Sequence, residues 1–323
     1  MKKFVLVWLC FLLFVTGCGN IKKTKTTEDK VAYEVIDAQG LKIGFTHKPQ
    51  RIITDSLGLD EIVLGIVPGE KLAAVNYLDS DRAISFIVNE TKNVEPKLKN
   101  YSSEEIAALQ PDLFIASAWT DKEKLQTLRR LGIPVVVCKG PATIKDVQDT
   151  VRLVAAALGE AGRGKLVNEK MNKELTKIDS VIKAQKQAKP VVMLVSLMSS
   201  YGGRGSLYDA LCQQAGLVNG IAKAGLKNGE FLAKELVVKV NPELFILSAP
   251  SRGDSILYEK YRKKFMSDKA LAGLTGINHV VVIPDRYLYC SSQNIIYGIK
   301  TLANKGYGQV LFPLGQENCL KGY

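Results

Sequence analysis

Histidine, the side chain most used in acid–base catalysis, is scarce in this chain. The 323 residues include only His47 and His279. A catalytic serine needs an imidazole base, and protein zinc sites commonly use several imidazoles. Neither histidine follows a predicted strand, where sites gather, and no G-x-S-x-G motif is present. The sequence therefore predicts a protein that is not an enzyme, with no metal site and no resident cofactor.

Arginine and aromatic side chains instead recur just after the predicted strands. In parallel sheets, ligands bind outside the carboxyl ends of the strands. Aromatic rings provide contact area and guanidinium groups bind oxygens in pairs, which suits a large flat or anionic ligand. For each residue the alternative is a solvated arginine or a tyrosine that covers the core. The predicted ligand contacts are Ser56, Tyr77, Arg82, Trp119, Tyr201, Arg204, Arg252, Arg286 and Tyr287, with Asp55, Asp79, Lys139 and Tyr289 beside them.

The glycine-rich stretch SSYGGRGS at 199–206 precedes a predicted helix that begins at Ser206. Backbone N–H groups at a helix N-terminus bind anions, and Arg204 adds positive charge. The stretch matches neither the P-loop nor the dinucleotide-binding motif. A flexible loop before a helix explains it equally well, so a small oxyanion such as molybdate is one of the ligands still open.

The first 17 residues have the plan of a signal peptide, with two lysines and then an apolar run from Phe4 to Val15. The following VTGC resembles a bacterial lipobox, which implies a lipid on Cys18; the alternative is a plain secretory signal. Residues 18–32 would then be a polar tether. We therefore expect a protein anchored to the outer side of the cell membrane, and export argues against nucleic acid as the partner suggested by the net charge of +12.

Strand and helix patterns alternate beyond the tether, which is the signature of an α/β fold with parallel sheets. RIIT (51–54), KLAAV (71–75), LFIAS (113–117) and IPVVVC (133–138) are the predicted strands of a first lobe at 33–142. A second lobe at 190–304 contains the predicted strands VVMLVS (191–196), LFILS (244–248) and HVVVIP (279–284). Residues 305–323 form a tail, which we expect to pack on the second lobe or to stay loose.

The segment 143–189 separates the lobes and contains a long helix. Its apolar residues recur at spacings of three and four and form a narrow stripe of Val167, Met171, Leu175, Ile178 and Ile182. About 25 residues of helix would extend roughly 38 Å. A coiled-coil partner would also explain the stripe, but Pro190 ends the helix where the second lobe begins, so we expect the helix to lie across both lobes.

Cys138, Cys212, Cys290 and Cys319 form no C-x-x-C pair. In an exported protein a disulfide and buried free thiols are both open.

One phrase occurs twice, as EEIAALQPDLFIAS at 104–117 and ELVVKVNPELFILS at 235–248. In each copy a glutamate lies seven residues before a proline, and an acidic residue follows the proline. The order of these phrases, together with HKPQRIITDSLGLDEIVLGI, LGIPVVV and the long helix, resembles the solute-binding proteins of bacterial ABC importers with a single helical backbone. That group handles iron–siderophores, haem and cobalamin.

The resemblance covers residues 33 to 303 and implies two α/β lobes with a ligand cleft between them. It also implies a partner, a dimeric permease with its ATPase subunits, whose permease arginines would bind Glu104 and Glu235. The alternative is that both are ordinary glutamates in the first turn of a helix. We expect a monomer that carries an iron–siderophore-type chelate. Haem, cobalamin or a molybdate-like oxyanion are the alternatives within this fold, and a structural surface lipoprotein is the alternative of another class.

Overall fold

The computed structural model describes residues 31–99, 101–196, 200–249, 255–313, 315 and 317–323. Residues 31–323 form one compact unit, in which two α/β lobes and a long helix are distinguished. The calls for a signal peptide and for a lipid on Cys18 fall outside the described residues. Within those residues, no helix combines the length and the apolar composition that a membrane crossing requires.

The first lobe is built on a three-stranded parallel sheet in the order β3-β6-β7. Its strands lie within the predicted apolar runs. Strands of a parallel sheet are buried on both faces, so they are formed by continuous apolar residues. All of Ile52, Ile53, Leu113, Phe114 and Ile115 are fully buried. The strands of the lobe are β1 (Tyr33–Ile36), β2 (Lys42–Phe45), β3 (Ile52–Thr54), β4 (Val75–Asn76), β5 (Lys97–Leu98), β6 (Leu113–Ala116) and β7 (Val135–Val137).

The helices of the first lobe lie between these strands, as the alternation predicts. They are α1 (Leu57–Ile66), α2 (Val88–Thr91), α3 (Ser103–Ala108) and α4 (Lys122–Arg130), with 3-10 turns η1 (Gly69–Lys71) and η2 (Tyr77–Ser80). The prediction of a strand at 71–75 is mostly wrong. Only β4 forms there, paired with β5, while Leu72 makes a single bridge to Ile52. Pro68 and Gly69 introduce a turn, which shortens the run available to a strand.

The second lobe carries a four-stranded parallel sheet in the order β11-β10-β8-β9. Its strands are β8 (Val191–Val195), β9 (Val218–Asn219), β10 (Leu244–Ala249) and β11 (Val280–Pro284). Its helices are α7 (Leu207–Gln214), α8 (Gly220–Lys223), α9 (Lys234–Val240), α10 (Ser255–Met266), α11 (Asp285–Leu288) and α12 (Ile295–Tyr307), with 3-10 turns η3 (Lys269–Leu271) and η4 (Thr275–Asn278). The helix predicted from Ser206 is α7, and the Ser206 hydroxyl accepts a hydrogen bond from the Asp209 N–H as its N-cap.

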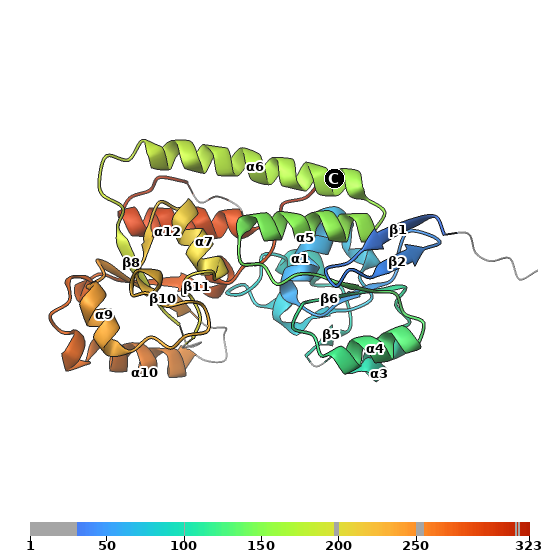
Figure 1. Ribbon diagram of the computed structural model, residues 1–323, viewed down its shortest axis with the longest axis horizontal. Coiled ribbons are helices and arrows are strands. Elements are labelled where there is room, and N and C mark those ends of the chain that lie inside the picture. The colour runs from blue at the N-terminus through green and yellow to red at the C-terminus, as the bar shows by residue number, and fades with distance from the viewer. Residues whose placement is uncertain (1–30, 100, 197–199, 250–254, 314, 316) are drawn as a thin grey trace, which may run out of the picture. The chain divides into compact units, whose positions relative to one another are not determined.

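Helices α5 (Ile144–Ala157) and α6 (Ala161–Lys183) connect the two lobes. Helix α6 has 23 residues, close to the predicted length, and lies along both lobes in Figure 1. It contacts α1 and α5 on one side and α7 and α12 on the other. Its stripe residues Val167, Met171 and Ile178 are fully buried. The prediction of an α/β fold with two parallel-sheet lobes joined by one long helix is therefore confirmed, and the stripe packs within the chain.

The twice-written phrase has the same structure in both lobes. Each copy is a short helix, a residue with left-handed backbone, a proline and a strand, and the left-handed residues are Gln110 (φ 48°) and Asn241 (φ 45°). The acidic residue after the proline receives backbone N–H groups of the neighbouring strand. Asp112 accepts from the N–H of Arg51 at 2.8 Å, and Glu243 accepts from the N–H of Val191 at 3.0 Å. The Pro–acid part of the phrase thus fixes where two strands meet.

The tail packs on both lobes, so the expectation of a loose tail is wrong and that of packing on the second lobe is right in part: the Tyr297 hydroxyl donates to the Asn318 carbonyl at 2.8 Å, and the last residues reach the first lobe. The Gly322 N–H donates to the Gly65 carbonyl at 2.7 Å, and the Tyr323 hydroxyl donates to the Leu64 carbonyl at 3.2 Å. Both acceptors lie in the last turn of α1, whose carbonyl groups lack partners within the helix. Cys319 is buried there, with its thiol 3.6 Å from the Glu61 carbonyl oxygen. The four cysteines of the described residues, Cys138, Cys212, Cys290 and Cys319, are buried free thiols.

Candidate ligand-binding cleft

A cavity of about 440 Å³ lies where the two lobes meet. Its wall is made by residues that directly follow or end parallel strands of both sheets, the position where α/β proteins bind ligands. The first lobe contributes Asp55, Ser56, Leu57, Gly58, Glu61, Asn76, Leu78 and Ile84. The second lobe contributes Ser196, Ser248, Asp285, Tyr289, Cys290 and Ser291. The volume is in the range of small-molecule sites.

Hydroxyl groups form much of the polar wall. Ser56 precedes α1 but its side chain does not cap that helix, so the hydroxyl is available to the cavity. Ser196 follows β8, and its hydroxyl lies 2.7 Å from the Tyr289 hydroxyl. The Tyr289 ring packs on the Tyr201 ring, with 5.1 Å between ring centroids. The wall can therefore donate and accept hydrogen bonds without a formal positive charge.

Glu61 is the carboxyl group that joins the lobes behind this wall. It belongs to α1 and is 2% exposed. It accepts hydrogen bonds from the Phe86 N–H at 3.1 Å and the Asn294 amide at 3.1 Å, and a short one from the Ser292 hydroxyl. Burial raises its pKa, while these bonds act in the opposite direction. With Oε1 bonded by the first lobe and Oε2 by the 290–294 segment, Glu61 is a structural connection between the two lobes.

Asp285 is the acidic wall residue contributed by the second lobe. It begins α11 directly after β11. Its Oδ1 is buried and has no hydrogen-bond partner within the described structure. Burial and the nearby Asp81 raise its pKa to about 7, and a hydrogen bond with the Ser248 side chain acts in the opposite direction. The Arg286 N–H donates to the Ala83 carbonyl of the first lobe at 2.9 Å, which holds this corner at the contact between lobes.

A second pair of carboxyl groups lies deeper in the first lobe. Asp60 and Asp79 are both fully buried. Asp60 accepts from the Thr54 hydroxyl at 3.0 Å and from the Asn76 N–H at 2.9 Å. Burial raises the pKa of Asp60 to about 8, and burial together with the adjacent Asp60 and Glu61 raises the pKa of Asp79 to about 10. This pair therefore carries at least one proton at neutral pH.

The structure brings only some of the predicted contacts to the cavity. Ser56 lines it, and Tyr201 supports Tyr289 from behind. Trp119 is 68% exposed and borders a small adjoining hollow that also includes Ser56 and Ser291. Tyr77 is exposed on η2, while its neighbours Asn76 and Leu78 line the cavity. Arg252 lies outside the described residues.

The predicted arginine contacts lie elsewhere. Arg204 is exposed, and its guanidinium contacts the Ala222 carbonyl at 3.5 Å. Arg82 and Arg286 border a different hollow, next to the tail. Arg286 lies over the Phe86 and Tyr287 rings and pairs with Glu317 at 3.3 Å, and the Tyr287 hydroxyl donates to the same carboxylate. Arg286 and Tyr287 therefore hold the tail through Glu317.

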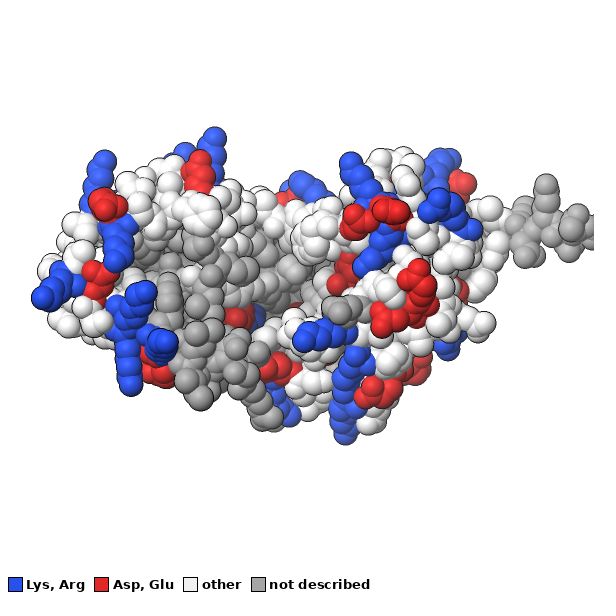
Figure 2. Space-filling model, turned by 90° about the horizontal axis from the view of Figure 1, so that it is seen from below, with Lys and Arg blue, Asp and Glu red and all other residues white. Residues whose placement is uncertain are grey.

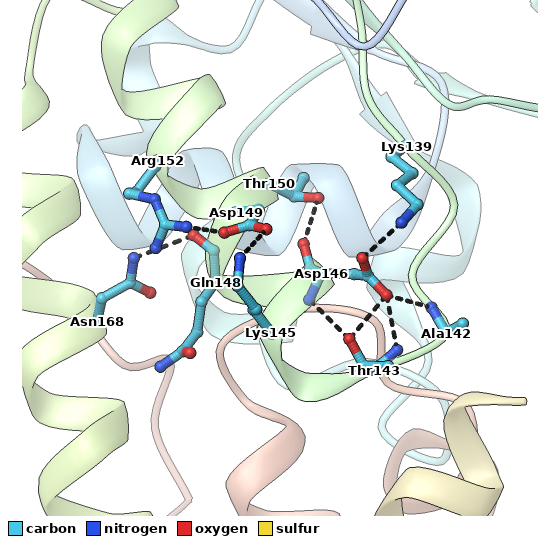
Figure 3. A network of polar contacts seen from close by, with 10 residues as sticks. All are labelled: Lys139, Ala142, Thr143, Lys145, Asp146, Gln148, Asp149, Thr150, Arg152 and Asn168. Atoms are coloured by element: carbon cyan, nitrogen blue, oxygen red, sulfur yellow. Dashed lines mark hydrogen bonds and ion pairs between the residues drawn. The ribbon is translucent and has the colours of Figure 1, made fainter. Parts of the chain in front are cut away.

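Lys139 is likewise engaged, as Figure 3 shows. Its ammonium group contacts Asp146 at 2.8 Å, and Asp146 forms a capping box with Thr143 at the start of α5. Partial burial acts to raise the pKa of Asp146, but the bonds from Lys139, Thr143 and two backbone N–H groups outweigh it and lower the pKa to about 2. Among the described residues that line the cavity, none is a lysine or arginine. No group of three or more His, Cys, Asp and Glu in the described part of the chain could hold a metal ion.

Sequence reasoning missed Asp285, Ser196 and Ser248. A signal was available, because each lies at the carboxyl end of a predicted strand. Arginine and tyrosine received more weight in the prediction, so Arg286 and Tyr287 were selected while Asp285, which precedes them, was omitted. Adjacent residues on a short helix point in different directions, and only the structure shows which of them lines the cavity.

The two glutamates of the repeated phrase lie on exposed first turns. Glu104 is on α3 and Glu235 is on α9. Figure 1 shows both helices on the side of the molecule away from α6, one in each lobe. Figure 2 shows that face, which is hollowed between the lobes and carries both acidic and basic side chains. Glu105, the neighbour of Glu104, is engaged in a capping box with Ser102.

A family model described as periplasmic binding protein matches residues 70–287, well over half of the chain. The search of curated proteins found no match to this chain. Among solved structures, the periplasmic haem-binding protein RhuT from Roseiflexus sp. RS-1 in apo form is 20% identical with a TM-score of 0.69, covering 80% of this chain and 98% of that one. A possible iron-binding periplasmic solute-binding protein from Staphylococcus epidermidis is 19% identical with a TM-score of 0.66, covering 81% and 100%. A periplasmic haem-binding protein from Pseudomonas aeruginosa is 17% identical with a TM-score of 0.67, covering 83% and 95%.

Proposed function

The chain belongs to the periplasmic binding protein family, and on that premise we propose that it captures an iron–siderophore-type chelate in the inter-lobe cavity and delivers it to a permease. Members of this family work outside the cytoplasm, bind small-molecule ligands and partner with ABC importer permeases. The observation that carries the proposal is the cavity of about 440 Å³, whose wall combines strand-end residues of both lobes. Its hydroxyl and carboxyl groups suit the oxygen- and nitrogen-rich periphery of a metal chelate.

Haem is the second candidate, and Tyr289 favours it. A tyrosine oxygen is a known axial ligand of haem iron, and the Tyr289 phenol lies in the cavity wall beside Ser196. Two of the similar solved structures named above are described as haem-binding. A molybdate-like oxyanion is less well supported, because the described wall has no lysine or arginine to neutralise it.

We further propose that the chain is exported, lipidated on Cys18 and active as a monomer. The support is the run from Phe4 to Val15 followed by VTGC. Replacing Cys18 with Ala should release the protein from the membrane fraction while ligand binding stays intact. If this variant remains in the membrane fraction, the lipid anchor is refuted.

The test is a titration of the mature chain with a ferric trihydroxamate, a ferric tris-catecholate, haem, cobalamin and molybdate. Once the signal segment is removed, Trp119 is the single tryptophan, and its fluorescence reports on the hollow beside the cavity. We expect quenching by a ferric chelate, and weaker binding after Ser196→Val. A Soret shift that is lost in Tyr289→Phe would identify haem instead. If no compound binds, a structural surface lipoprotein becomes the better account.

A further inference from the structure

We infer that Asp285 is the residue that selects the charge of the cargo, and that the cargo presents an N–H or O–H donor to it and carries no net negative charge. This inference rests on the proposed function, since it names the class of chelate that the same cavity accepts. It replaces the expectation of an anionic chelate held by arginines. Ferric hydroxamates that are neutral or cationic belong to the favoured class, and ferric tris-catecholates do not.

The position of Asp285 is fixed from two sides. It is the first residue of α11, and β11 before it pairs with β10 along its whole length. The next residue, Arg286, is bonded through its backbone to Ala83 and through its side chain to Glu317. The backbone at Asp285 is therefore held at the cavity wall by contacts with the neighbouring strand, the first lobe and the tail.

The Oδ1 atom of Asp285 is an acceptor without a partner. It is buried, and no described group donates to it. A buried acceptor left unpaired is destabilising, and native structures contain few of them. The other wall carboxyl groups differ, because Asp55 accepts from the Ser117 N–H at 3.0 Å and Glu61 is bonded on both oxygens. Asp285 is thus the wall carboxyl that a ligand donor would complete.

The charge balance of the described wall disfavours anions. The described wall contains Asp55, Glu61 and Asp285 and neither lysine nor arginine. The N-terminus of α1 also faces the cavity through Ser56, Leu57 and Gly58, but a helix end is equivalent to only about half an elementary charge. Asp81 of the first lobe adds a further negative charge close to Asp285. An anionic cargo would meet repulsion that this helix end does not offset.

The experiment compares two ferric trihydroxamates, one cationic and one neutral, with a ferric tris-catecholate and haem. Dissociation constants are measured for the wild type and for Asp285→Ala and Asp285→Asn. We expect the wild type to prefer the hydroxamates. Asp285→Ala should weaken their binding by about 10-fold to 100-fold, as the loss of a charge-assisted bond predicts. The variant should also show a smaller difference between the dissociation constants of the cationic hydroxamate and the tris-catecholate.

The matched control is Asp179→Asn, which removes an exposed carboxylate from α6 and should leave all constants unchanged. The ratio of two dissociation constants within one variant does not depend on the folded fraction, so partial misfolding cannot imitate the result. Tighter binding of the tris-catecholate or haem by the wild type, unaffected by Asp285→Ala, would overturn the inference but keep the proposed function. Failure of every chelate to bind the wild type would overturn the proposed function itself.

Discussion

Buried carboxyl groups are the most unusual individual residues of this molecule. Asp60 and Asp79 lie side by side in the first lobe with no exposed surface. An ionised carboxylate is costly to bury, so proteins respond by keeping such a group protonated. The pKa values of about 8 and about 10 express this response. In the unfolded chain both groups ionise near pH 4.

Stability should therefore fall as pH rises. Because the folded pKa values are raised, the folded state binds more protons, and the stabilisation is complete below about pH 4 and is lost as pH rises through 8 to 10. Each extra proton contributes a slope of about 1.4 kcal/mol per pH unit. Asp79→Asn should remove one such contribution, which urea unfolding between pH 5 and 8 can measure. Glu123→Gln, an exposed control on α4, should keep the wild-type slope; an unchanged slope in Asp79→Asn would contradict the assignment.

At the residue scale, the sequence predicted where the site is better than which side chains form it. The rule that strand ends build ligand sites led to Ser56, which lines the cavity. It could not show that Glu317, Asp146 and Ala222 would already bind Arg286, Lys139 and Arg204. Glu317 and Ala222 are 31 and 18 residues from their partners, and Asp146 is seven residues from Lys139, so none of these contacts follows a helix or strand period. The unpaired oxygen of Asp285 is likewise visible only after folding.

At the element scale, the predicted pattern was reliable wherever an apolar run was long and uninterrupted. The runs that became β6, β8 and β10 have this property, and the regular spacing of the apolar stripe served α6 equally well. The KLAAV segment failed because a turn before it and a short partner strand limited its pairing to two residues. The contact of the tail with the first lobe escaped prediction for another reason, since it is made with the C-terminal turn of α1 some 250 residues earlier in the chain, as the bond between Tyr323 and Leu64 shows.

The crossing of α5 and α6 is the point at which the long helix depends most on one residue. A Cβ atom on Gly164 would lie 2.3 Å from the Ala155 Cβ and 3.4 Å from the Val151 carbonyl oxygen. Gly162 lies two residues earlier in the same helix, and a Cβ atom there would have no neighbouring atom within 4 Å. We therefore expect Gly164→Ala to lower the free energy of unfolding by about 1–3 kcal/mol through overpacking.

Gly162→Ala is the matched control. It should be neutral or stabilise the protein by up to about 1 kcal/mol, since alanine has the higher helix propensity. Chemical denaturation of the two variants side by side makes the comparison. Equal effects of the two substitutions would show that α5 and α6 do not approach each other closely at Gly164.

At the scale of the whole molecule, several contacts tie the two lobes together. They include α6, the Glu61 contacts with residues 290–294, the bond between Arg286 and Ala83, and the tail bound to α1. Helix α6 lies on the side of the molecule away from α3 and α9 (Figure 1). The face with α3 and α9 carries one copy of the repeated phrase in each lobe. The Pro–acid half of the phrase is explained by strand pairing, whereas the exposed glutamate seven residues before the proline makes no contact that the fold requires.

We propose that these two glutamates bind the permease, and the final prediction tests this. Exposed ion pairs contribute only about 0–1 kcal/mol each, but loss of one partner at a desolvated interface can cost about 2–5 kcal/mol. Glu104→Lys combined with Glu235→Lys should therefore leave ligand affinity unchanged and abolish uptake by the reconstituted importer. Binding to the permease should weaken most at low salt, where repulsion between like charges is least screened. The matched control reverses two exposed acidic residues of α6, Glu169 and Asp179, which lie on the opposite side of the molecule and should not affect transport. Normal transport by the Glu104 and Glu235 double variant would show that the phrase is repeated for its fold alone.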